Sequence, residues 1–317
     1  MALKNEILSL LLSADDYISG EYIAAKFGKS RAAVWKAIKA LQADGYGISA
    51  QTNRGYRLTD SRNLVSAQGI RAFLKSDIAI EYFTEVDSTN NVCKRMLADG
   101  REGAFLVAAN HQTSGRGRQG KSFYSPADTG IYFSLVIRPN SSLQNAVTAT
   151  TAAAVAVCRA IESMTKKRPQ IKWVNDVYLD GKKICGILTE AVTNFEDGTV
   201  DSVIIGIGIN ISTVDFPQEL SQAGSLDTEV NRNLLIAEIV DELVKIATAD
   251  YNEFIDYYRS HSYVLGKKIN FIRSGKVTPA TAVAIDETGG LVVELEDKST
   301  TTLRSGEISV RINNSEV

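Results

Sequence analysis

Residues 115–121, Gly115-Arg116-Gly117-Arg118-Gln119-Gly120-Lys121, decide how the rest of this sequence is interpreted. Their glycines allow the backbone to wrap closely around a ligand. Their cations, Arg116, Arg118 and Lys121, cannot be buried together in an apolar core. The stretch therefore predicts a loop that meets concentrated negative charge, most naturally that of a nucleotide phosphate.

The same stretch matches G-x-G-x-x-G, the pattern of a dinucleotide-binding turn. Residues 105–109 can form the preceding strand, but residues 121–126, Lys-Ser-Phe-Tyr-Ser-Pro, cannot open a helix over a pyrophosphate. No acidic residue ends a second strand about 20 positions further on, so the pattern does not indicate a dinucleotide-binding site here. A solvated surface loop is the other alternative, and the polar motifs elsewhere in the chain weigh against it.

Four further segments place polar groups or bare backbone near the ends of predicted strands. They are residues 87–90 (Asp-Ser-Thr-Asn) with Gln112, residues 172–177 (Lys-Trp-Val-Asn-Asp-Val), residues 183–188 (Lys-Ile-Cys-Gly-Ile-Leu) and residues 206–210 (Gly-Ile-Gly-Ile-Asn). In the last segment, glycines at alternate positions leave one face of a strand as bare backbone. We expect a rigid bicyclic ligand to lie against that face.

The bulk properties describe a globular protein of more than one domain. A chain of 317 residues exceeds the size at which a single core usually stops growing. No apolar run approaches the roughly 20 residues that cross a bilayer. The start, Met-Ala-Leu-Lys-Asn-Glu, carries an acidic residue that does not fit a signal peptide. We expect a cytoplasmic protein with no membrane partner.

The cysteines and histidines exclude two classes of site. Cys93, Cys158 and Cys185 are far apart and form no C-x-x-C, and the histidines are His111 and His261. Neither a disulfide framework nor a zinc site can be assembled from this set with ordinary spacing. A net charge of -2 argues against a protein that coats nucleic acid, although a local basic face remains open.

Residues 1–60 are predicted to form three short helices and a hairpin. Ser19-Gly20 opens the second helix, and Ser30 is a suitable N-cap for a third helix over Arg31–Ala43. Residues 48–58 fold back through Asn53-Arg54-Gly55, whose Asn and Gly tolerate positive φ. This order of elements is typical of a winged helix-turn-helix, with Arg54 at the wing tip.

Basic residues gather on the predicted third helix and the turn before it. From Tyr22 to Ala43 there are five basic residues and no acidic one, which is the charge distribution that phosphates require. A small helical domain with solvated lysines is the alternative, and Trp35 either contacts DNA or packs on the next domain. The expected DNA-binding residues are Lys29, Ser30, Arg31, Trp35, Lys36, Lys39 and Arg54.

The remainder of the chain is predicted to form two more domains. Residues 61–68 are a polar linker, and residues 69–265 mix strands with helices as in a mixed sheet backed by helices. Its strands are expected at 80–83, 105–109, 131–137 and 203–211, and its helices at 143–164 and 234–258. Residues 266–317 contain short alternating stretches (268–272, 280–285, 290–295 and 300–304) that predict a small all-β barrel.

Together these motifs resemble the biotin protein ligase family. The G-R-G-R-x-G loop, the K-W-x-N-D bend, the K-x-x-G-I-L strand, the G-I-G-I-N strand and the terminal Ser305-Gly306-Glu307 recur in the family's order. The helix-turn-helix ahead of them resembles the bifunctional subgroup, in which the ligase is also the biotin operon repressor. The resemblance implies an α+β multidomain protein: a winged helix-turn-helix, a class II synthetase-like ligase domain and a C-terminal SH3-like barrel.

The resemblance also implies a reaction and its partners. Biotin reacts with ATP, assisted by Mg²⁺, to give biotinyl-5'-adenylate and pyrophosphate. The adenylate then acylates a lysine of the biotin carboxyl carrier protein of acetyl-CoA carboxylase and related carboxylases. Adenylate binding would also produce a homodimer that binds operator DNA and represses biotin genes.

Site roles carry over by resemblance to matching positions. Lys183 would hold the biotin carboxylate and the α-phosphate, Arg118 would retain the adenylate, and Asp176 and Lys172 would complete the catalytic group. The biotin site would comprise Ser88, Thr89, Asn90, Gln112, Arg116, Gly117, Arg118, Lys183, Gly206 and Gly208. The ATP site would comprise Arg116, Arg118, Lys121, Phe123, Lys172, Asn175 and Asn210, with Asn175 and Asp176 serving Mg²⁺ or orienting the incoming lysine.

Several positions depart from the family's commonest pattern. Val174 stands where proline is usual, Lys121 replaces arginine, and Phe123-Tyr124 replaces a Trp-Phe pair. Cys185 replaces alanine, and its thiol is either reactive or, as we favour, small and buried. Two other functions remain open: a biotin-sensing regulator without ligase activity, and a ligase for lipoate or octanoate, which the hydrogen-bonding groups of the biotin site disfavour.

Overall fold

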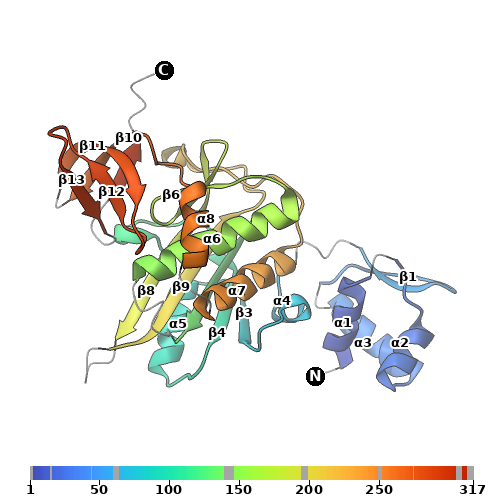
Figure 1. Cartoon of the computed structure of the whole chain (residues 1–317). Helices are drawn as coiled ribbons and strands as arrows, with labels where there is room; N and C mark the ends of the chain where they lie inside the picture. The colour runs from blue at the N-terminus through green and yellow to red at the C-terminus, as the bar shows by residue number, and fades with distance from the viewer. Residues whose placement is uncertain are drawn as a thin grey trace.

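The computed structural model describes residues 3–14, 16–43, 45–59, 64–138, 146–193, 199–248, 252–273, 275–304 and 309–312. These residues form three parts that follow one another along the chain (Figure 1). A helical part with a hairpin comes first, a mixed sheet with helices lies in the middle, and an antiparallel sheet comes last. The predicted multidomain α+β class is confirmed.

The N-terminal part has the elements of a winged helix-turn-helix: α1 (Leu3–Leu12), α2 (Gly20–Phe27), α3 (Arg31–Ala43), β1 (Ile48–Gln51) and β2 (Gly55–Leu58). The predicted caps are present, because Ser19 Oγ accepts from the Tyr22 N–H at 3.0 Å and Ser30 Oγ from the Ala33 N–H at 3.2 Å. Its core is a separate cluster that includes Ile7, Leu8, Leu11, Ile23, Val34, Ile38 and Leu41.

The wing is tied to the chain before α2. The β1–β2 turn uses positive φ at Asn53 and Gly55, as predicted. Ile18 N–H donates to the Tyr56 carbonyl at 2.8 Å, and Tyr56 N–H donates back to Ile18 at 2.9 Å. These two backbone hydrogen bonds fix the base of the wing against the helical bundle.

Helix α4 (Ala67–Phe73) joins the first two parts, and it begins inside the segment predicted to be a linker. It contacts α1 on one side and α7 (Arg232–Thr248) on the other. Asn233 of α7 strengthens the junction, since its Oδ1 accepts from the Ser66 N–H at 3.1 Å and its Nδ2 donates to the Leu64 carbonyl at 2.8 Å. The exact domain boundaries stay a prediction.

The central sheet has the strand order β3-β4-β5-β9-β8-β7-β6. Only β3 and β4 pair in parallel and every other neighbouring pair is antiparallel, which confirms the mixed sheet. The bounds are β3 (Ala79–Val86), β4 (Phe105–Gln112), β5 (Gly130–Ile137), β6 (Gln170–Lys172), β7 (Asp176–Leu179), β8 (Lys182–Thr193) and β9 (Val200–Asn210).

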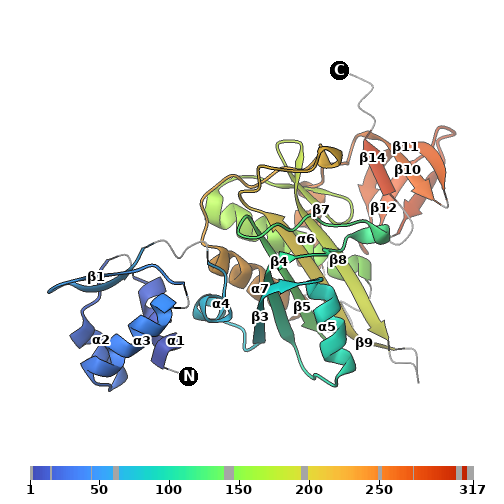
Figure 2. The same cartoon turned by 180° about the vertical axis from the view of Figure 1, so that it is seen from behind.

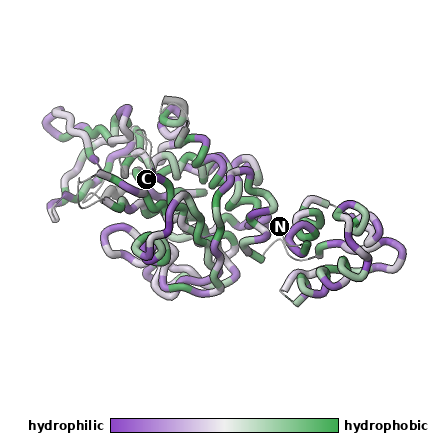
Figure 3. The backbone as a smooth tube through the Cα atoms, turned by 90° about the horizontal axis from the view of Figure 1, so that it is seen from below, coloured by the Kyte–Doolittle hydropathy of each residue, from purple (hydrophilic) through white to green (hydrophobic). Residues whose placement is uncertain are grey.

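Helices cover both faces of this sheet. Alternate residues of β4 show the division: Leu106 and Ala108 belong to the main core with α6 (Ala146–Thr165), whereas Phe105 and Val107 pack with α5 (Thr89–Ala98). Helix α6 lies in front of the sheet in Figure 1, and α5 lies in front in the reverse view of Figure 2. In Figure 3 the interior of this part is mainly hydrophobic and the outer loops are mainly hydrophilic.

The predicted single helix over 234–258 is wrong. The structure has two helices, α7 and α8 (Asn252–Ser260), which run in different directions and both contact α6 (Figure 1). The buried positions continue at helical spacing from one to the other, so periodicity alone merges them: Leu235, Ile239, Leu243, Ile246, Phe254 and Tyr258. Residues 143–145 of the other predicted helix lie outside the described residues.

The C-terminal part is an antiparallel sheet of order β13-β12-β11-β10-β14. Its strands are β10 (Lys268–Arg273), β11 (Lys276–Ile285), β12 (Leu291–Glu294), β13 (Thr300–Leu303) and β14 (Ser309–Ile312), the last of which was not predicted. The outer strands β13 and β14 are not paired within the described residues, so closure into a barrel stays a prediction. Ser305-Gly306-Glu307 falls outside the described residues.

Hydrogen bonds join the C-terminal sheet to the central part. Trp173 is buried, and its Nε1 donates to the Gly289 carbonyl at 2.8 Å. Arg259 Nε donates to the Ile285 carbonyl at 2.9 Å. Trp173 therefore packs against the C-terminal sheet, and it also lines the cavity described below. Within the described part of the chain, no helix has the length and apolar character that crossing a membrane requires.

Candidate active site

A cavity of about 620 Å³ lies between the glycine loop, residues 115–121, and the strands β6, β7 and β8. The structure brings most of the predicted catalytic and nucleotide-binding residues into its wall. Those lining it are Arg116, Gly117, Arg118, Lys121, Phe123, Lys172, Asn175, Asp176 and Lys183. Motifs separated by up to about 70 positions in the sequence therefore converge on one cavity.

The glycine loop doubles back on itself at the edge of this cavity. Gly117 N–H donates to the Lys121 carbonyl at 2.7 Å, and Phe123 N–H donates to the Gly115 carbonyl at 2.8 Å. A Cβ on Gly115 would lie 2.3 Å from the Phe123 carbonyl oxygen, so a side chain cannot be accommodated there. Glycine is needed because two backbone segments cross at close range.

Arg118 ties the loop to the β6–β7 bend. Its Nη1 donates to Asn175 Oδ1 at 2.9 Å. Burial lowers the pKa of the Arg118 guanidinium from its usual value, and the nearby charge of Asp176 acts in the opposite direction. A cation that has lost part of its water in this way interacts strongly with an anion placed beside it.

Lys183, at the start of β8, faces Asp176, at the start of β7. Lys183 Nζ lies 2.7 Å from Asp176 Oδ1, and Asn175 Nδ2 donates to the same oxygen at 3.0 Å. Lys172 Nζ lies 5.3 Å from the centre of the Tyr178 ring. The described lining residues include five cations, Arg116, Arg118, Lys121, Lys172 and Lys183, and a single carboxylate, so the wall suits a polyanion.

The bare-backbone face predicted on β9 is present, but side chains of the protein lie against it. A Cβ on Gly208 would be 2.3 Å from Phe123 Cε1, and one on Gly206 would be 2.1 Å from Asn90 Oδ1. Gly186, paired with Gly208 across the sheet, also lies under the Phe123 ring. Phe123 and Gly186 line the cavity, whereas Gly206 and Gly208 are not among the described lining residues, so their contact with biotin stays a prediction.

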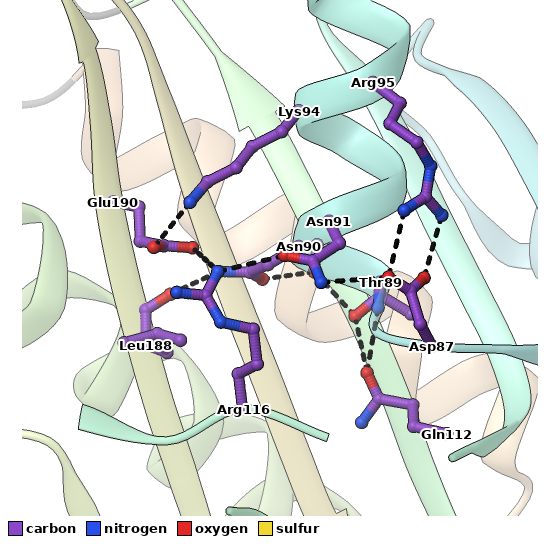
Figure 4. Close-up of polar contacts among 11 residues, drawn as sticks. Asp87, Thr89, Asn90, Asn91, Lys94, Arg95, Gln112, Arg116, Leu188 and Glu190 are labelled. Carbon is purple, nitrogen blue, oxygen red and sulfur yellow. Dashed lines mark hydrogen bonds and ion pairs between the residues drawn. The ribbon is translucent and has the colours of Figure 1, made fainter. Parts of the chain in front are cut away.

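The predicted biotin-binding residues that precede the glycine loop form a separate, buried network beside the cavity (Figure 4). The Thr89 N–H donates to Gln112 Oε1 at 2.9 Å, and Gln112 Nε2 donates to Ser125 Oγ at 2.8 Å. Ser134 Oγ, which sequence reasoning missed, donates to Asn90 Oδ1 at 2.6 Å. Ser88, Thr89, Asn90, Gln112 and Asn210 are buried but are not among the described lining residues, so their ligand roles stay predictions.

Glu190 of β8 is a second residue that sequence reasoning missed. It lies opposite Arg116 and Lys94 in Figure 4, at 3.0 Å and 2.7 Å respectively. Burial raises the pKa of Glu190, but hydrogen bonds from Lys94 and Asn90 and the charge of Arg116 outweigh it, so the pKa lies below its usual range. The sequence does contain a signal for this position. Side chains two residues apart on a strand share a face, so Glu190 lies on the same face of β8 as Leu188 and Gly186.

Aromatic residues from two distant segments form another part of the wall. Tyr178 of β7 and Tyr263, which follows α8, stack with ring centres 5.1 Å apart, and both line the cavity. Lys267 Nζ lies 3.7 Å from the centre of the Tyr263 ring. Nothing in the local sequence around Tyr263 indicates this position, because the fold alone brings the two segments together.

The expected DNA-binding residues are all exposed: Lys29, Ser30, Arg31, Trp35, Lys36, Lys39 and Arg54. The Trp35 side chain is 55% exposed with Lys39 Nζ over its ring, so it does not pack on the central part of the chain. Arg54 lies in the wing turn as predicted, and its Nη2 is 2.9 Å from Asp16 Oδ1. The Cys185 side chain is fully buried, as favoured.

Comparisons with known proteins agree with this arrangement. Residues 82–210 match the Biotin/lipoate A/B protein ligase family, residues 4–57 an HTH domain and residues 264–311 the Biotin protein ligase C terminal domain. The chain is 32% identical to the bifunctional ligase/repressor BirA of Bacillus subtilis over 310 residues, covering 93% of this chain and 95% of the relative. Identity to the Escherichia coli protein of the same description is 26%, covering 96% of each.

Solved structures show the same fold. A biotin protein ligase from Aquifex aeolicus in complex with biotin and ATP superposes with a TM-score of 0.63 and 27% identity, covering 74% of this chain and 99% of that one. The central sheet and its cationic cavity therefore define a biotin ligase. The N-terminal helix-turn-helix and the full-length match narrow this further, and the chain belongs to the family of bifunctional biotin ligase/repressors.

Proposed function

We propose that this protein activates biotin with ATP to biotinyl-5'-adenylate and transfers biotin to a lysine of a biotin carboxyl carrier protein. The acceptors are those of acetyl-CoA carboxylase and related carboxylases. The same chain represses biotin genes as an adenylate-dependent homodimer on operator DNA. The observation that carries the enzymatic part is the cavity lined by five cations and one carboxylate, Asp176, which pairs with Lys183.

In the first half-reaction, a biotin carboxylate oxygen attacks the α-phosphorus of ATP, and the bond to pyrophosphate breaks. Negative charge accumulates on the phosphoryl oxygens as this happens, so fixed cations lower the barrier. Lys183 holds the carboxylate and the α-phosphate, and Arg118 closes over the product. Lys172 and Lys121, which line the same cavity, meet the remaining phosphates.

Magnesium fits this site as a partner of ATP. Mg²⁺ prefers oxygen donors and is commonly held by one or two carboxylates together with substrate phosphates. Asp176 is the carboxylate in the wall, and Asn175, whose Nδ2 donates to Asp176 Oδ1, adds an amide oxygen that accepts from Arg118 Nη1. These two residues would hold the ion, which would neutralise the charge of the departing pyrophosphate.

In the second half-reaction, the acceptor lysine attacks the acyl carbon of the adenylate as a neutral amine. An amide bond forms and AMP leaves with the electrons of the acyl–oxygen bond. Asp176, the carboxylate in the wall of the same cavity, would take the proton of the amine. Lys183 then remains as the cation that balances the released AMP.

The DNA-binding part rests on α3 and the wing, which carry the exposed basic side chains. Two copies related by a two-fold axis would present two such helices to an operator with two half-sites. The cytoplasm is the compartment in which carboxylases and operator DNA are both available, and we place the protein there.

Pyrophosphate exchange into ATP tests the enzymatic proposal. The purified protein is assayed with Mg²⁺ and with biotin, lipoate or no acid. Exchange that requires biotin supports adenylation, exchange with lipoate alone changes the substrate, and no exchange with either leaves a regulator without ligase activity. A gel shift with operator DNA tests regulation, and equal affinity with and without biotin plus ATP would contradict adenylate-dependent repression.

A further inference from the structure

Glu190 stands where the glycine loop, α5 and β8 meet. Its Oε2 accepts from Arg116 Nη1 at 3.0 Å and from Asn90 Nδ2 at 2.9 Å, and its Oε1 accepts from Lys94 Nζ at 2.7 Å. Arg116 Nη1 also donates to Asn91 Oδ1 at 3.1 Å. One carboxylate thus contacts both the glycine loop, through Arg116, and α5, through Lys94 (Figure 4).

The environment makes this contact stronger than an ordinary surface ion pair. The Glu190 side chain is 18% exposed, and its pKa lies below the usual range, so it is ionised at neutral pH. Charge-assisted hydrogen bonds to a partly buried carboxylate are stronger than those between neutral groups. The glycine loop is therefore held at two points, by Arg118 to Asn175 and by Arg116 to Glu190.

Glu190 also contacts the buried network, through Asn90. Asn90 Nδ2 donates to Glu190, while Asn90 Oδ1 accepts from Ser134 Oγ and lies under Gly206. The carboxylate therefore fixes the orientation of the Asn90 amide as well as the position of Arg116. A neutral amide in place of Glu190 would keep the shape but lose the attraction to both cations.

We propose that Glu190 is a positioning residue that holds the glycine loop over the cavity through Arg116. Through this contact it sets how long the reactive adenylate stays bound before water or a wrong nucleophile reaches it. This inference rests on the proposed adenylation. It assigns no direct contact between Glu190 and biotin or ATP.

Retention of preformed adenylate tests the inference. The full-length wild-type protein, Glu190→Gln and the control Glu81→Gln are loaded with radiolabelled biotin and ATP, separated from free ligand and followed for release of label. We expect Glu190→Gln to shorten the half-life of the complex about tenfold, the effect of losing one charge-assisted hydrogen bond. Glu81 pairs with Arg101 at 3.3 Å on β3, outside the cavity wall, so Glu81→Gln should behave as wild type.

A double-mutant cycle separates positioning from a general structural effect. Arg116→Gln should shorten the half-life by at least the same factor, because Arg116 also lines the cavity. Glu190→Gln with Arg116→Gln should be no worse than Arg116→Gln alone. Additive losses, or a wild-type half-life in Glu190→Gln, would overturn the inference. Arg116→Gln changes an exposed loop side chain, so it remains informative even where Glu190→Gln folds poorly.

Trypsin cleavage of the ligand-free protein provides a readout that does not need adenylation. The loop offers cleavage after Arg116, Arg118 and Lys121. We expect faster cleavage there in Glu190→Gln than in wild type or Glu81→Gln, with an unchanged thermal unfolding midpoint. Unchanged cleavage would overturn the inference. Failure of the wild-type protein to form any adenylate would overturn the proposed function and with it the role in adenylate retention, while the cleavage rates would still decide whether Glu190 holds the loop.

Discussion

Lys183 Nζ lies 2.7 Å from Asp176 Oδ1, and a one-residue irregularity in the sheet makes this contact possible. Val177 pairs with Cys185, but the next residue, Tyr178, pairs with Lys183 instead of Ile184. Side chains alternate between the faces of a strand, so regular pairing would turn Lys183 to the face opposite Asp176. The bulge therefore places the cation and the carboxylate on the same side, at the cavity.

Replacing Lys183 should abolish the chemistry without unfolding the protein. We expect Lys183→Ala to lower the rate of biotin-dependent pyrophosphate exchange at least about 100-fold, because a fixed charge at the developing oxyanion is lost. Lys182→Ala is the matched control, since Lys182 Nζ donates to the Ser221 carbonyl at 2.8 Å and is not among the described lining residues. If Lys183→Ala kept half of the wild-type exchange rate, Lys183 would have no role in the chemical step.

Of the two glycines under the Phe123 ring, Gly208 should tolerate an added methyl group less well than Gly186. A Cβ on Gly208 would lie 2.3 Å from the Phe123 ring, whereas a Cβ on Gly186 would lie 3.0 Å from it. Gly208→Ala should displace the ring, cost about 1–3 kcal/mol of unfolding free energy and raise the KM for biotin or ATP. Gly186→Ala should have a smaller effect on both the unfolding free energy and the KM. Urea unfolding and exchange kinetics measure the two effects, and the reverse order would contradict this position of Phe123.

Local signals in the sequence were sufficient for the N-terminal domain. The caps at Ser19 and Ser30 and the positive φ values at Asn53 and Gly55 depend on residues only a few positions apart. Such interactions follow from side-chain chemistry and backbone sterics without knowledge of the rest of the fold. The glycine loop was predictable for the same reason.

Contacts between segments that are distant in the chain could not be predicted from the sequence. The strand period puts Glu190 on the same face as Gly186, but it does not identify Arg116 and Lys94 as partners of Glu190. Tyr263 reaches the site through packing after α8 and is not marked by a local motif. The sequence likewise showed that β9 has a bare face but not that Phe123 covers Gly208. The α7–α8 boundary was missed because apolar spacing continues across it, and periodicity carries no information about a change of direction.

The three cysteines should be unreactive in the native protein. The side chains of Cys93, Cys158 and Cys185 are fully buried, and burial raises the pKa of the Cys93 thiol to about 12. The reactive thiolate is therefore scarce at pH 8, and the reagent cannot reach it. A coloured thiol reagent should show no fast reaction with folded protein and three reactive thiols in urea. Fast labelling of Cys185 in the folded state would revive the alternative of a reactive thiol.

Gly55→Ala should separate the two proposed functions. Gly55 has a φ of 109°, and a Cβ there would lie 2.0 Å from the Ile18 carbonyl oxygen, whose hydrogen bond anchors the wing. A side chain must therefore push the wing away from the helical bundle.

We expect Gly55→Ala to weaken operator binding more than about tenfold, since phosphate contacts from the wing are lost together. Biotin-dependent exchange should stay at the wild-type rate, because the cavity is built from residues after the linker. Gly28→Ala is the matched control: Gly28 also has positive φ, at 60°, but a Cβ there meets nothing within 4 Å. That variant should lose only about 1 kcal/mol of unfolding free energy. Operator affinity equal to wild type in Gly55→Ala would show that the wing does not contribute to DNA binding.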